Sequence, residues 1–237
     1  MSGVDRRPRG GTRAGCSACT SASVGEGLSS LDVTFSIVAC DPVDGSWGVA
    51  VASRFLAVGA NVPAAEVDAG ALATQALTNM AYRRSGLAML RAGEGAKAVV
   101  DSLVAGDDGR EARQVGVVDA HGGAAVWTGS ECQPWAGSRT GNGFAVQGNL
   151  LHGPEVVDAM AQAWLAGDGS AALAHRLLAA LAAGDAAGGD RRGRQSAALY
   201  VARRGSHFDA EVDLRVDDAP HPVDELARLL ALRYDGR

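Results

Sequence analysis

The sequence predicts an α+β fold in which antiparallel sheets are flanked by helices. Short runs of apolar and β-branched residues, typical of strands, are followed by longer stretches in which apolar residues recur every three or four positions, typical of helices. Their order is strands, helices, strands, helices, strands and a last helix, which is neither a Rossmann alternation nor a pure sandwich. The 237 residues, 47% of them hydrophobic, suffice for one domain of about 200 residues with a sizeable core.

The first 33 residues differ from the rest in composition. They are mainly Gly, Ser, Ala, Thr and Arg, with almost no large apolar residue, so they cannot bury enough surface to become ordered. They also lack the apolar stretch of a secretory signal. We therefore expect residues 1–33 to be a disordered or non-native extension, and residues 34–237 to form a single domain.

The first half of that domain begins with a hairpin. Residues 34–40 are apolar and partly β-branched, Asp41 to Gly45 have the composition of a turn, and residues 46–53 resume an extended pattern. A third extended run covers residues 71–75. It leads to two stretches with helical periodicity, Asn79 to Arg91 and Gly95 to Val104.

The second half repeats this order. Predicted strands cover residues 114–119, 124–127 and 144–147, and helices follow from Pro154 to Leu165 and from Ala171 to Ala183. Gly184 is expected to end the second of these helices as its C-cap. Two more strands, residues 196–201 and 212–216, precede an amphipathic helix with Val223, Leu226, Leu229 and Leu230 on one face.

Charge and cysteine content exclude several classes of function. The net charge of −5 argues against non-specific nucleic-acid binding, and no run reaches the roughly 18 apolar residues of a membrane span. Cys16 and Cys19 have the spacing of half a zinc site, but no second pair follows. We expect a cytoplasmic protein without a metal or another cofactor. Its abundant Gly and Ala, with Lys97 as its single lysine, suggest a GC-rich bacterial genome.

Several longer stretches resemble a known bacterial family in the same order along the chain. They are TFSIVACDP, GVAVASRFLAVG, ATQA, VVDAHGGAAVWTG, WAG, QGNLLHG, AGGDRRGRQSAAL and VDLRVDD. Together they resemble the family catalogued as domain of unknown function 1028, from Thr34 to about Arg233. That family is grouped with the N-terminal-nucleophile (Ntn) hydrolases. The resemblance implies a four-layer α-β-β-α sandwich of two antiparallel sheets with helices outside.

The resemblance also implies that Thr34 is a nucleophile, because it matches the start position of the family. An Ntn hydrolase attacks an amide with the side chain of its first residue and uses the α-amine of that residue as general base. Without the resemblance, Thr34 is equally well explained as a β-branched residue at the edge of a strand. Proteasome-like relatives also use an aspartate and a lysine. Here Ala52 stands at the place of the aspartate and no lysine lies on an early strand.

Thr34 is internal in the printed chain, whereas the mechanism needs a free α-amine. One explanation is self-cleavage between Val33 and Thr34. The other, which we favour, is translation from codon 33, because some valine codons serve as bacterial start codons and the resulting methionine is readily removed before threonine. This second explanation also accounts for the composition of residues 1–33.

Two further residues are candidates for catalysis. Arg54 follows the second strand and could stabilise a developing negative charge, or it could form an ion pair with Asp41 or Asp44. Asn149 resembles the asparagine with which some Ntn amidases bind the oxyanion. Alternatively it caps the turn before the helix that starts at Pro154.

Ligand-binding candidates lie in two other segments. Thr74 and Gln75 could donate hydrogen bonds to a ligand, or form buried hydrogen bonds at the end of their strand. The segment 187–196 has glycines and three arginines, which could bind a carboxylate or phosphate, although such segments are often solvated turns. Its Asp190 could hold a substrate ammonium or orient the Thr34 amine. The candidates in this segment are Asp190, Arg191, Arg194 and Gln195.

The leading hypothesis is an Ntn-type hydrolase that cleaves a small amide or short peptide with an anionic or zwitterionic end. Two alternatives remain open. One is a binding module that keeps the fold and binds an anionic ligand without turnover. The other is a structural subunit of a homo-oligomer, and we expect a homo-oligomer in either case.

Overall fold

The computed structural model describes residues 34–235, together with Met1 and Gly3. The predicted extension, residues 1–33, lies outside the described residues apart from those two positions, as do Cys16 and Cys19. All further statements about structure concern the described residues.

The larger of two antiparallel sheets, sheet A, has six strands in the order β10-β9-β2-β1-β8-β7. Its central strand β1 pairs with the neighbouring β2 along the chain and with the distant β8. The strands are β1 (Thr34–Asp41), β2 (Ser46–Ser53), β7 (Gly137–Gly141), β8 (Phe144–Asn149), β9 (Ser196–Arg203) and β10 (Val212–Val216).

The smaller sheet, sheet B, has four strands in sequence order, each antiparallel to the next. They are β3 (Pro63–Glu66), β4 (Gly70–Ala76), β5 (Arg113–Asp119) and β6 (Ala124–Thr128). Two 3-10 helices, η1 (Val58–Ala60) and η2 (Arg110–Ala112), precede β3 and β5 respectively. Strands β1 and β2 of sheet A contact β4 and β3 of sheet B, so the two sheets pack against one another.

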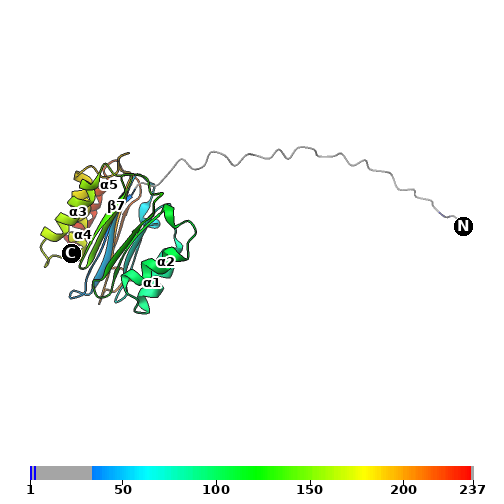
Figure 1. Ribbon diagram of the computed structural model, residues 1–237, viewed down its shortest axis with the longest axis horizontal. Coiled ribbons are helices and arrows are strands. Elements are labelled where there is room, and N and C mark those ends of the chain that lie inside the picture. The colour runs from blue at the N-terminus through cyan, green and yellow to red at the C-terminus, as the bar shows by residue number, and fades with distance from the viewer. Residues whose placement is uncertain (2, 4–33, 236–237) are drawn as a thin grey trace. The chain divides into compact units, whose positions relative to one another are not determined.

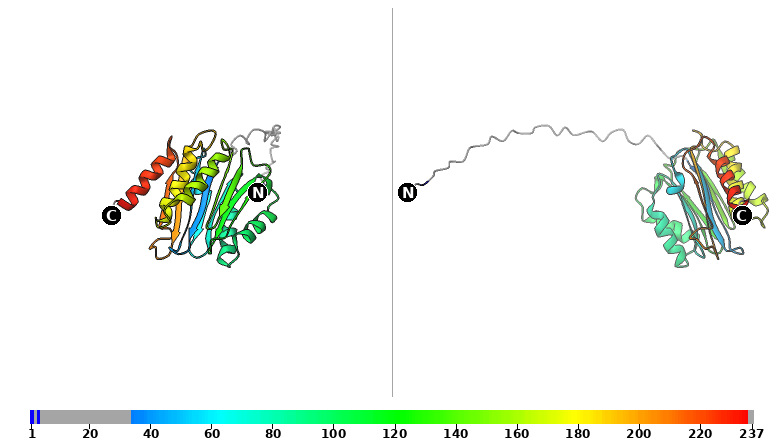
Figure 2. Two further views of the ribbon diagram at one scale, coloured as in Figure 1. Left: turned by 60° about the vertical axis from the view of Figure 1, so that its left-hand side comes forward. Right: turned by 180° about the vertical axis from the view of Figure 1, so that it is seen from behind.

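Five α-helices in the described residues pack against the outer faces of the sheets. They are α1 (Ala81–Arg91), α2 (Ala96–Ala105), α3 (Pro154–Ala166), α4 (Leu173–Ala186) and α5 (Pro222–Asp235). Helices α1 and α2 contact sheet B, whereas α3, α4 and α5 contact sheet A (Figures 1 and 2). The prediction of an α+β fold with two antiparallel sheets is therefore confirmed.

Alternation along the strands places the core in three apolar layers. On β1, Phe35 and Ile37 pack toward α3–α5, while Val38 and Cys40 pack toward sheet B. On the far side of sheet B, Leu72 and neighbouring side chains pack against α1 and α2. Side chains of a strand point alternately to its two faces. A central strand with both faces covered therefore carries apolar residues at almost every position, and β1 reads as a nearly continuous apolar run.

The predicted strands and helices are all present, but three details differ from expectation. Strands β3 and β7 were not predicted: β3 has four residues, and β7 contains two glycines and no large apolar side chain. Gly184 was expected to cap a helix, but α4 continues through it to Ala186. A Cβ at Gly184 would lie 2.5 Å from Cγ of Met160. This glycine therefore allows α4 to pack closely on α3.

Gly48 on β2 gives the first testable prediction. A Cβ there would lie 2.7 Å from the carbonyl oxygen of Tyr200 and 2.9 Å from Cδ1 of Leu177 in α4. Because the nearer contact is backbone of the paired strand β9, it cannot move aside without disturbing the sheet. We expect Gly48→Ala to lower the free energy of unfolding by about 1–3 kcal/mol, measured by urea denaturation.

Gly169→Ala is the matched control, because nothing lies within 4 Å of a Cβ at Gly169. The control should stay within about 0.5 kcal/mol of the parent protein. Equal stability of the two variants would contradict the close approach of β2, β9 and α4.

Candidate functional site

A row of polar side chains crosses the four inner strands of sheet A at one end, on the face that meets sheet B. Thr34, the first residue of β1, is paired with Ser53 on β2 and with Asn149 on β8. Ser53 is in turn paired with Ser196 on β9. Directly paired residues of antiparallel strands point to the same face. All four side chains therefore face sheet B, and all four are buried.

Sheet B presents a matching polar row to sheet A. Gln75 at the end of β4 is paired with Gln114 on β5, and Gln114 is paired with Thr128 on β6. Gln75 and Gln114 are both fully buried. The two rows meet at one end of the space between the sheets, where they replace the apolar packing found farther along the same strands.

The carboxamide of Gln114 joins the two rows. Its Oε1 accepts hydrogen bonds from Nε2 of Gln75 at 2.8 Å and from Nδ2 of Asn149 at 3.1 Å. Its Nε2 donates to the carbonyl of Gly148 at 2.9 Å and to the hydroxyl of Thr128 at 3.0 Å. A buried amide is costly unless its hydrogen bonds are made. Gln114 thus fixes one sheet to the other at this end.

Two more buried polar side chains lie one step farther along sheet A. The hydroxyl of Ser36 donates to Oε1 of Gln75 at 2.6 Å, and Nε2 of Gln147 donates to the carbonyl of Ala73 at 3.0 Å. A Cβ at Gly116 would lie 3.0 Å from Oε1 of Gln147. The glycine on β5 therefore leaves room for the Gln147 side chain between the sheets.

Thr34 contacts both rows through its side chain and its backbone. Its hydroxyl donates to Oγ of Ser53 at 3.3 Å, and its carbonyl accepts a hydrogen bond from Nε2 of Gln75 at 3.1 Å. In the full chain Thr34 exposes 1% of its surface. Residues of both sheets therefore hydrogen-bond to the first residue of β1, and the Thr34 hydroxyl lies among them.

The backbone turns sharply directly after two of these residues. Ala76 follows Gln75 with φ at 63°, and Leu150 follows Asn149 with φ at 52°. Such values are uncommon for residues other than glycine and cost free energy. Asn149 is thus the last residue of β8, and Gln75 is the last residue but one of β4, so both strands end close to Thr34.

The loop after α4 lies against the same end of sheet A through Asp190. This residue is 1% exposed and bridges to Leu151, two residues after Asn149. Its carboxylate accepts hydrogen bonds from the backbone N–H groups of Arg54 at 2.9 Å and Arg192 at 2.8 Å. Burial raises the pKa of the Asp190 carboxyl, while those bonds and the Arg192 charge oppose the rise. Asp190 is therefore buried and hydrogen-bonded within its loop, and the alternative of a solvated turn is wrong for this residue.

The arginines of this region have different partners. Arg194 forms a bidentate ion pair with Asp185 of α4, which occupies the fork that would bind a ligand anion. Arg54 donates from its exposed side chain to the carbonyl of Arg192. The alternative of an ion pair between Arg54 and Asp41 or Asp44 is wrong, because those carboxylates pair with Arg176 and Arg203 respectively. Arg191 is exposed, and its side chain has no ion pair within residues 34–235.

Two predicted ligand-binding residues lie apart from Thr34. Thr74 points to the opposite face of β4, and its buried hydroxyl donates to the carbonyl of Asn79 at 3.4 Å. This is the strand-end hydrogen bond that was its alternative role. Gln195 is partly exposed and donates to Asp218 at 3.0 Å. The structure therefore brings together Thr34, Gln75 and Asn149, with Arg54 and Asp190 beside them.

The sequence reasoning missed Ser36, Gln114 and Gln147, which complete the network. Ser36 interrupts an apolar run in β1, while Gln114 and Gln147 lie directly beside the apolar residues of β5 and β8, and these polar residues within buried strands were the available signal. Asn149 was weighed as the cap of the turn before α3. Its side chain instead reaches Gln114, and α3 has no side-chain hydrogen bond at its N-cap, Gly153.

Other polar clusters do not add a metal centre. Among the described residues, no group of three or more His, Cys, Asp or Glu side chains could hold a metal ion. Cys40 and Cys132 are free thiols, and burial raises the pKa of Cys132 to about 11. None of the helices of residues 34–235 combines the length and apolar character needed to cross a membrane.

Known proteins resemble this chain over most of its length. A family model described as "Family of unknown function (DUF1028)" matches residues 34–226. Among solved structures, the chain is similar to protein SPO2555 from Silicibacter pomeroyi, whose crystal structure carries the same family model. The two are 36% identical over 84% of this chain and 89% of that chain, with a TM-score of 0.77. No curated protein matches.

Gln114→Leu tests the link between the two polar rows. The change removes the acceptor of two buried donors and leaves the Gly148 carbonyl without its side-chain donor. We expect the free energy of unfolding to fall by about 2–4 kcal/mol, measured by chemical denaturation. The control is Gln133→Leu, because Gln133 is exposed, and it should change stability by less than about 0.5 kcal/mol. A loss no larger than that of the control would contradict the network.

Asp190→Ala tests the loop. It leaves the N–H groups of Arg54 and Arg192 without their carboxylate acceptor, so we expect a loss of about 2–4 kcal/mol in a thermal or urea unfolding experiment. Asp218→Ala, in an exposed pair with Gln195, should cost less than about 1 kcal/mol. If both variants unfold alike, Asp190 does not organise this loop.

Proposed function

This chain belongs to the family of unknown function DUF1028, and we propose that it is a hydrolase of the Ntn type that cleaves a small amide or short peptide with Thr34 as nucleophile. The observation that carries the proposal is the placement of Thr34. Its hydroxyl lies at the start of the central strand of sheet A, among amide and hydroxyl groups from both sheets.

The proposed fold relationship is with the four-layer α-β-β-α sandwich of the Ntn hydrolases. Helices α3–α5, sheet A, sheet B and helices α1–α2 contact one another in this order. In that architecture the nucleophile is the first residue of a central strand. The position of Thr34 at the start of β1, between β2 and β8, is consistent with this relationship.

The proposed reaction uses two groups of Thr34 itself. The hydroxyl oxygen forms a bond to the carbonyl carbon of the substrate amide while the α-amine accepts the hydroxyl proton. That proton then passes to the leaving nitrogen, the C–N bond breaks, and an amine departs. Water hydrolyses the acyl ester on Thr34, which releases a carboxylic acid and restores the hydroxyl. An α-amine titrates near 7.7–8.0, so part of it is neutral at physiological pH.

The reaction requires a form of the protein that begins at Thr34. In the printed chain Val33 precedes it, so the backbone nitrogen of Thr34 is an amide and has no basic lone pair. Thr34 is also buried in this full chain. A substrate carbonyl therefore reaches the hydroxyl only in a form that is open at this end of β1.

The neighbours of Thr34 supply the remaining roles in this proposal. An asparagine carboxamide has two N–H donors; one hydrogen of Asn149 goes to Gln114, which leaves the second for the oxyanion of the tetrahedral intermediate. The hydroxyl of Ser53 accepts from Thr34 and fixes its rotamer. Gln75 holds the Thr34 carbonyl, so it is a positioning residue. Arg54 contributes positive charge close to this end of β2.

The proposed substrate carries an anionic or zwitterionic end. Arg191 is the exposed arginine of the 187–196 loop whose charge is not committed to an ion pair within the described residues. It lies next to Asp190, which bonds to the backbone beside Ser53. A guanidinium at this place could bind a substrate carboxylate. Arg194 is not expected to do so, because Asp185 holds it.

A second candidate function is a binding module without turnover. It is favoured by the same observations that restrict the first: Thr34 has no free amine in the printed chain and is buried. A homo-oligomer remains a prediction under both functions.

Thr34→Ala in a chain that starts at residue 34 separates the two functions. We expect hydrolysis of a panel of short peptides and aminoacyl amides to fall by roughly a thousandfold or more, because hydroxyl and amine act as one catalytic unit. Thr34→Ser should keep partial activity, since only a methyl group is lost. Product formation is measured by mass spectrometry.

Three controls accompany this experiment. Thermal unfolding of Thr34→Ala should resemble that of the parent, and an electrophile that labels N-terminal threonine should modify the parent and spare the variant. The full chain with residues 1–33 attached should be nearly as inactive as Thr34→Ala. Turnover that is unaffected by the attached segment or by Thr34→Ala would rule out Thr34 as the nucleophile.

A further inference from the structure

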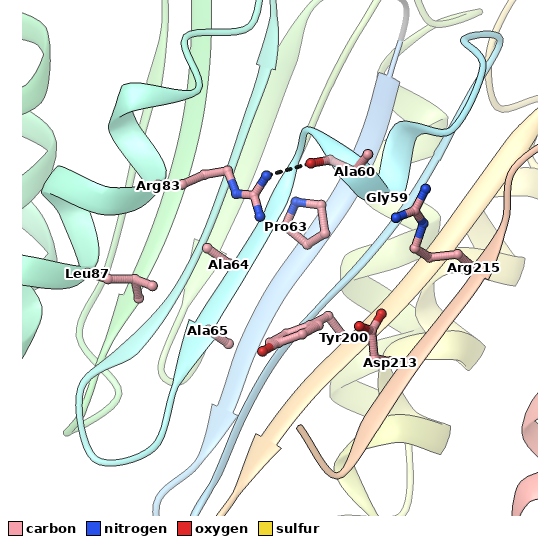
Figure 3. A pocket seen from close by; sticks show the side chains of 10 residues that line it. All are labelled: Gly59, Ala60, Pro63, Ala64, Ala65, Arg83, Leu87, Tyr200, Asp213 and Arg215. Carbon is pink, nitrogen blue, oxygen red and sulfur yellow. Dashed lines mark hydrogen bonds between the residues drawn. The ribbon is translucent and has the colours of Figure 1, made fainter. Parts of the chain in front are cut away.

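Sheet A extends past sheet B at one edge and leaves part of its inner face uncovered. Sheet B ends at β3, which lies against β2 and β9, whereas sheet A continues from β9 to β10. The side chains that would face a fifth strand are polar: Tyr200 on β9 with Asp213 and Arg215 on β10. They line a hollow of about 260 Å³ together with η1, β3 and α1 (Figure 3). The hollow is smaller than the roughly 300–1,000 Å³ of sites for drug-sized ligands.

The hollow contains a half-buried positive charge without an ion pair. Arg83 of α1 donates from NH1 to the carbonyl of Ala60 at 2.6 Å, and no carboxylate in the described residues lies within ion-pair distance of it. Burial lowers the pKa of its guanidinium. A charge that is partly removed from water is costly unless it is paired. The remaining N–H groups of Arg83 therefore suit an anionic ligand.

Tyr200 and Asp213 complete a site with two signs of charge. The phenol hydroxyl of Tyr200 makes no hydrogen bond within residues 34–235, and burial raises its pKa, so it remains a donor. Asp213 also lacks an ion pair among those residues. Figure 3 shows the guanidinium of Arg83 near Ala60 and Pro63, the carboxylate of Asp213 beside Tyr200, and the Tyr200 hydroxyl directed toward Ala65. After burial, the negative charges of Asp213, Asp209 and Glu66 also raise the pKa of Tyr200, whereas the positive charge of Arg83 lowers it.

Arg215 does not compete for an anion in this hollow. Its guanidinium is held by Asp217 through contacts of 2.9 Å and 3.1 Å. The unpaired cation of Arg83 and the unpaired anion of Asp213 thus both line this small space. A simple anion would be attracted by Arg83 and repelled by Asp213. A simple cation would be attracted by Asp213 and repelled by Arg83.

We propose that this hollow binds a small zwitterion, a free α-amino acid or dipeptide, with its carboxylate on Arg83 and Tyr200 and its ammonium on Asp213. The site lies at the β3–β10 edge, separated from Thr34 by strand β2. It does not depend on the function proposed for Thr34. Products of peptide hydrolysis belong to this ligand class, so occupancy of the hollow would report their concentration to the protein.

The competing explanation is structural. Arg83 ties η1 to α1 through the Ala60 carbonyl, and this bond alone could account for the guanidinium. A structural role predicts that Arg83→Gln lowers the thermal unfolding temperature without any effect of amino acids. The proposal predicts in addition that Asp213 contributes to the binding of amino acids. Asp213 is exposed, and its side chain links no elements of the fold within the described residues.

Isothermal titration of the full chain tests the proposal with L-alanine as probe. We expect binding in the millimolar range, as the few atoms of this ligand allow. Acetate and methylamine, each with one of its two charges, should bind at least about tenfold more weakly. Arg83→Gln and Asp213→Asn should each weaken L-alanine binding by about tenfold or more, the effect of losing one charged hydrogen bond. Arg228→Gln, an exposed arginine of α5, is the matched control and should leave binding unchanged.

The possible outcomes separate this site from the one at Thr34. Thr34→Ala should bind L-alanine like the parent, and its binding should still be lost when Asp213→Asn is added. The proposal is overturned if L-alanine does not bind even at concentrations well above the millimolar range. It is also overturned if L-alanine binds but neither Arg83→Gln nor Asp213→Asn changes its affinity. Acetate binding as strong as that of L-alanine would also overturn it, in favour of a plain anion site. Asp213→Asn keeps the test valid if Arg83→Gln does not fold.

Discussion

The buried carboxamide of Gln114 joins the two sheets at the end where β1 begins. Elsewhere between the sheets, apolar side chains set the distance between the sheets, but their contacts are not directional. A buried amide, in contrast, requires hydrogen-bond partners at defined positions. Gln114 accepts from Gln75 of its own sheet and from Asn149 of the other, and it donates to the Gly148 carbonyl. These bonds fix how the two sheets are aligned along their strands. They therefore also fix which side chains surround Thr34.

The residues of the candidate site are held in two different ways. Thr34, Gln75 and Asn149 lie on strands of the two sheets, held by ladder and side-chain hydrogen bonds. Arg54 and Asp190 lie outside the strands, and the carboxylate of Asp190 holds them together by accepting the backbone N–H groups of Arg54 and Arg192.

The unequal widths of the sheets give the molecule a second polar region. A six-stranded sheet packed on a four-stranded one leaves strand faces that no partner covers. At the β10 edge these faces carry Tyr200, Asp213 and Arg215, while the covered part of β9 carries alanines. Both polar regions thus occur where the apolar layer between the sheets stops, one at the strand ends and one at the sheet edge. In the first, most of the polar side chains hydrogen-bond to one another, with Oε1 of Gln147 left without a partner. In the second, Arg83 and Asp213 form no ion pair within the described residues.

Apolar periodicity and turn residues act over a few positions, so the sequence alone predicts the hairpin of β1 and β2, the helices and the α+β class. The place of Gln75 at the end of a strand indicated a possible donor, whereas Thr34 and Asn149 were indicated by the resemblance to the family and to Ntn amidases. The folded structure was needed to establish that β8 pairs with β1, that Gln114 links these residues, that Asp185 holds Arg194 and that Thr74 faces away. The paired residues of β1 and β8 are more than a hundred positions apart in the chain, and the other outcomes depend on strand register or on packing of α1 and α4. Local sequence carries no information on such pairings, since each side chain has many possible partners and burial selects one of them.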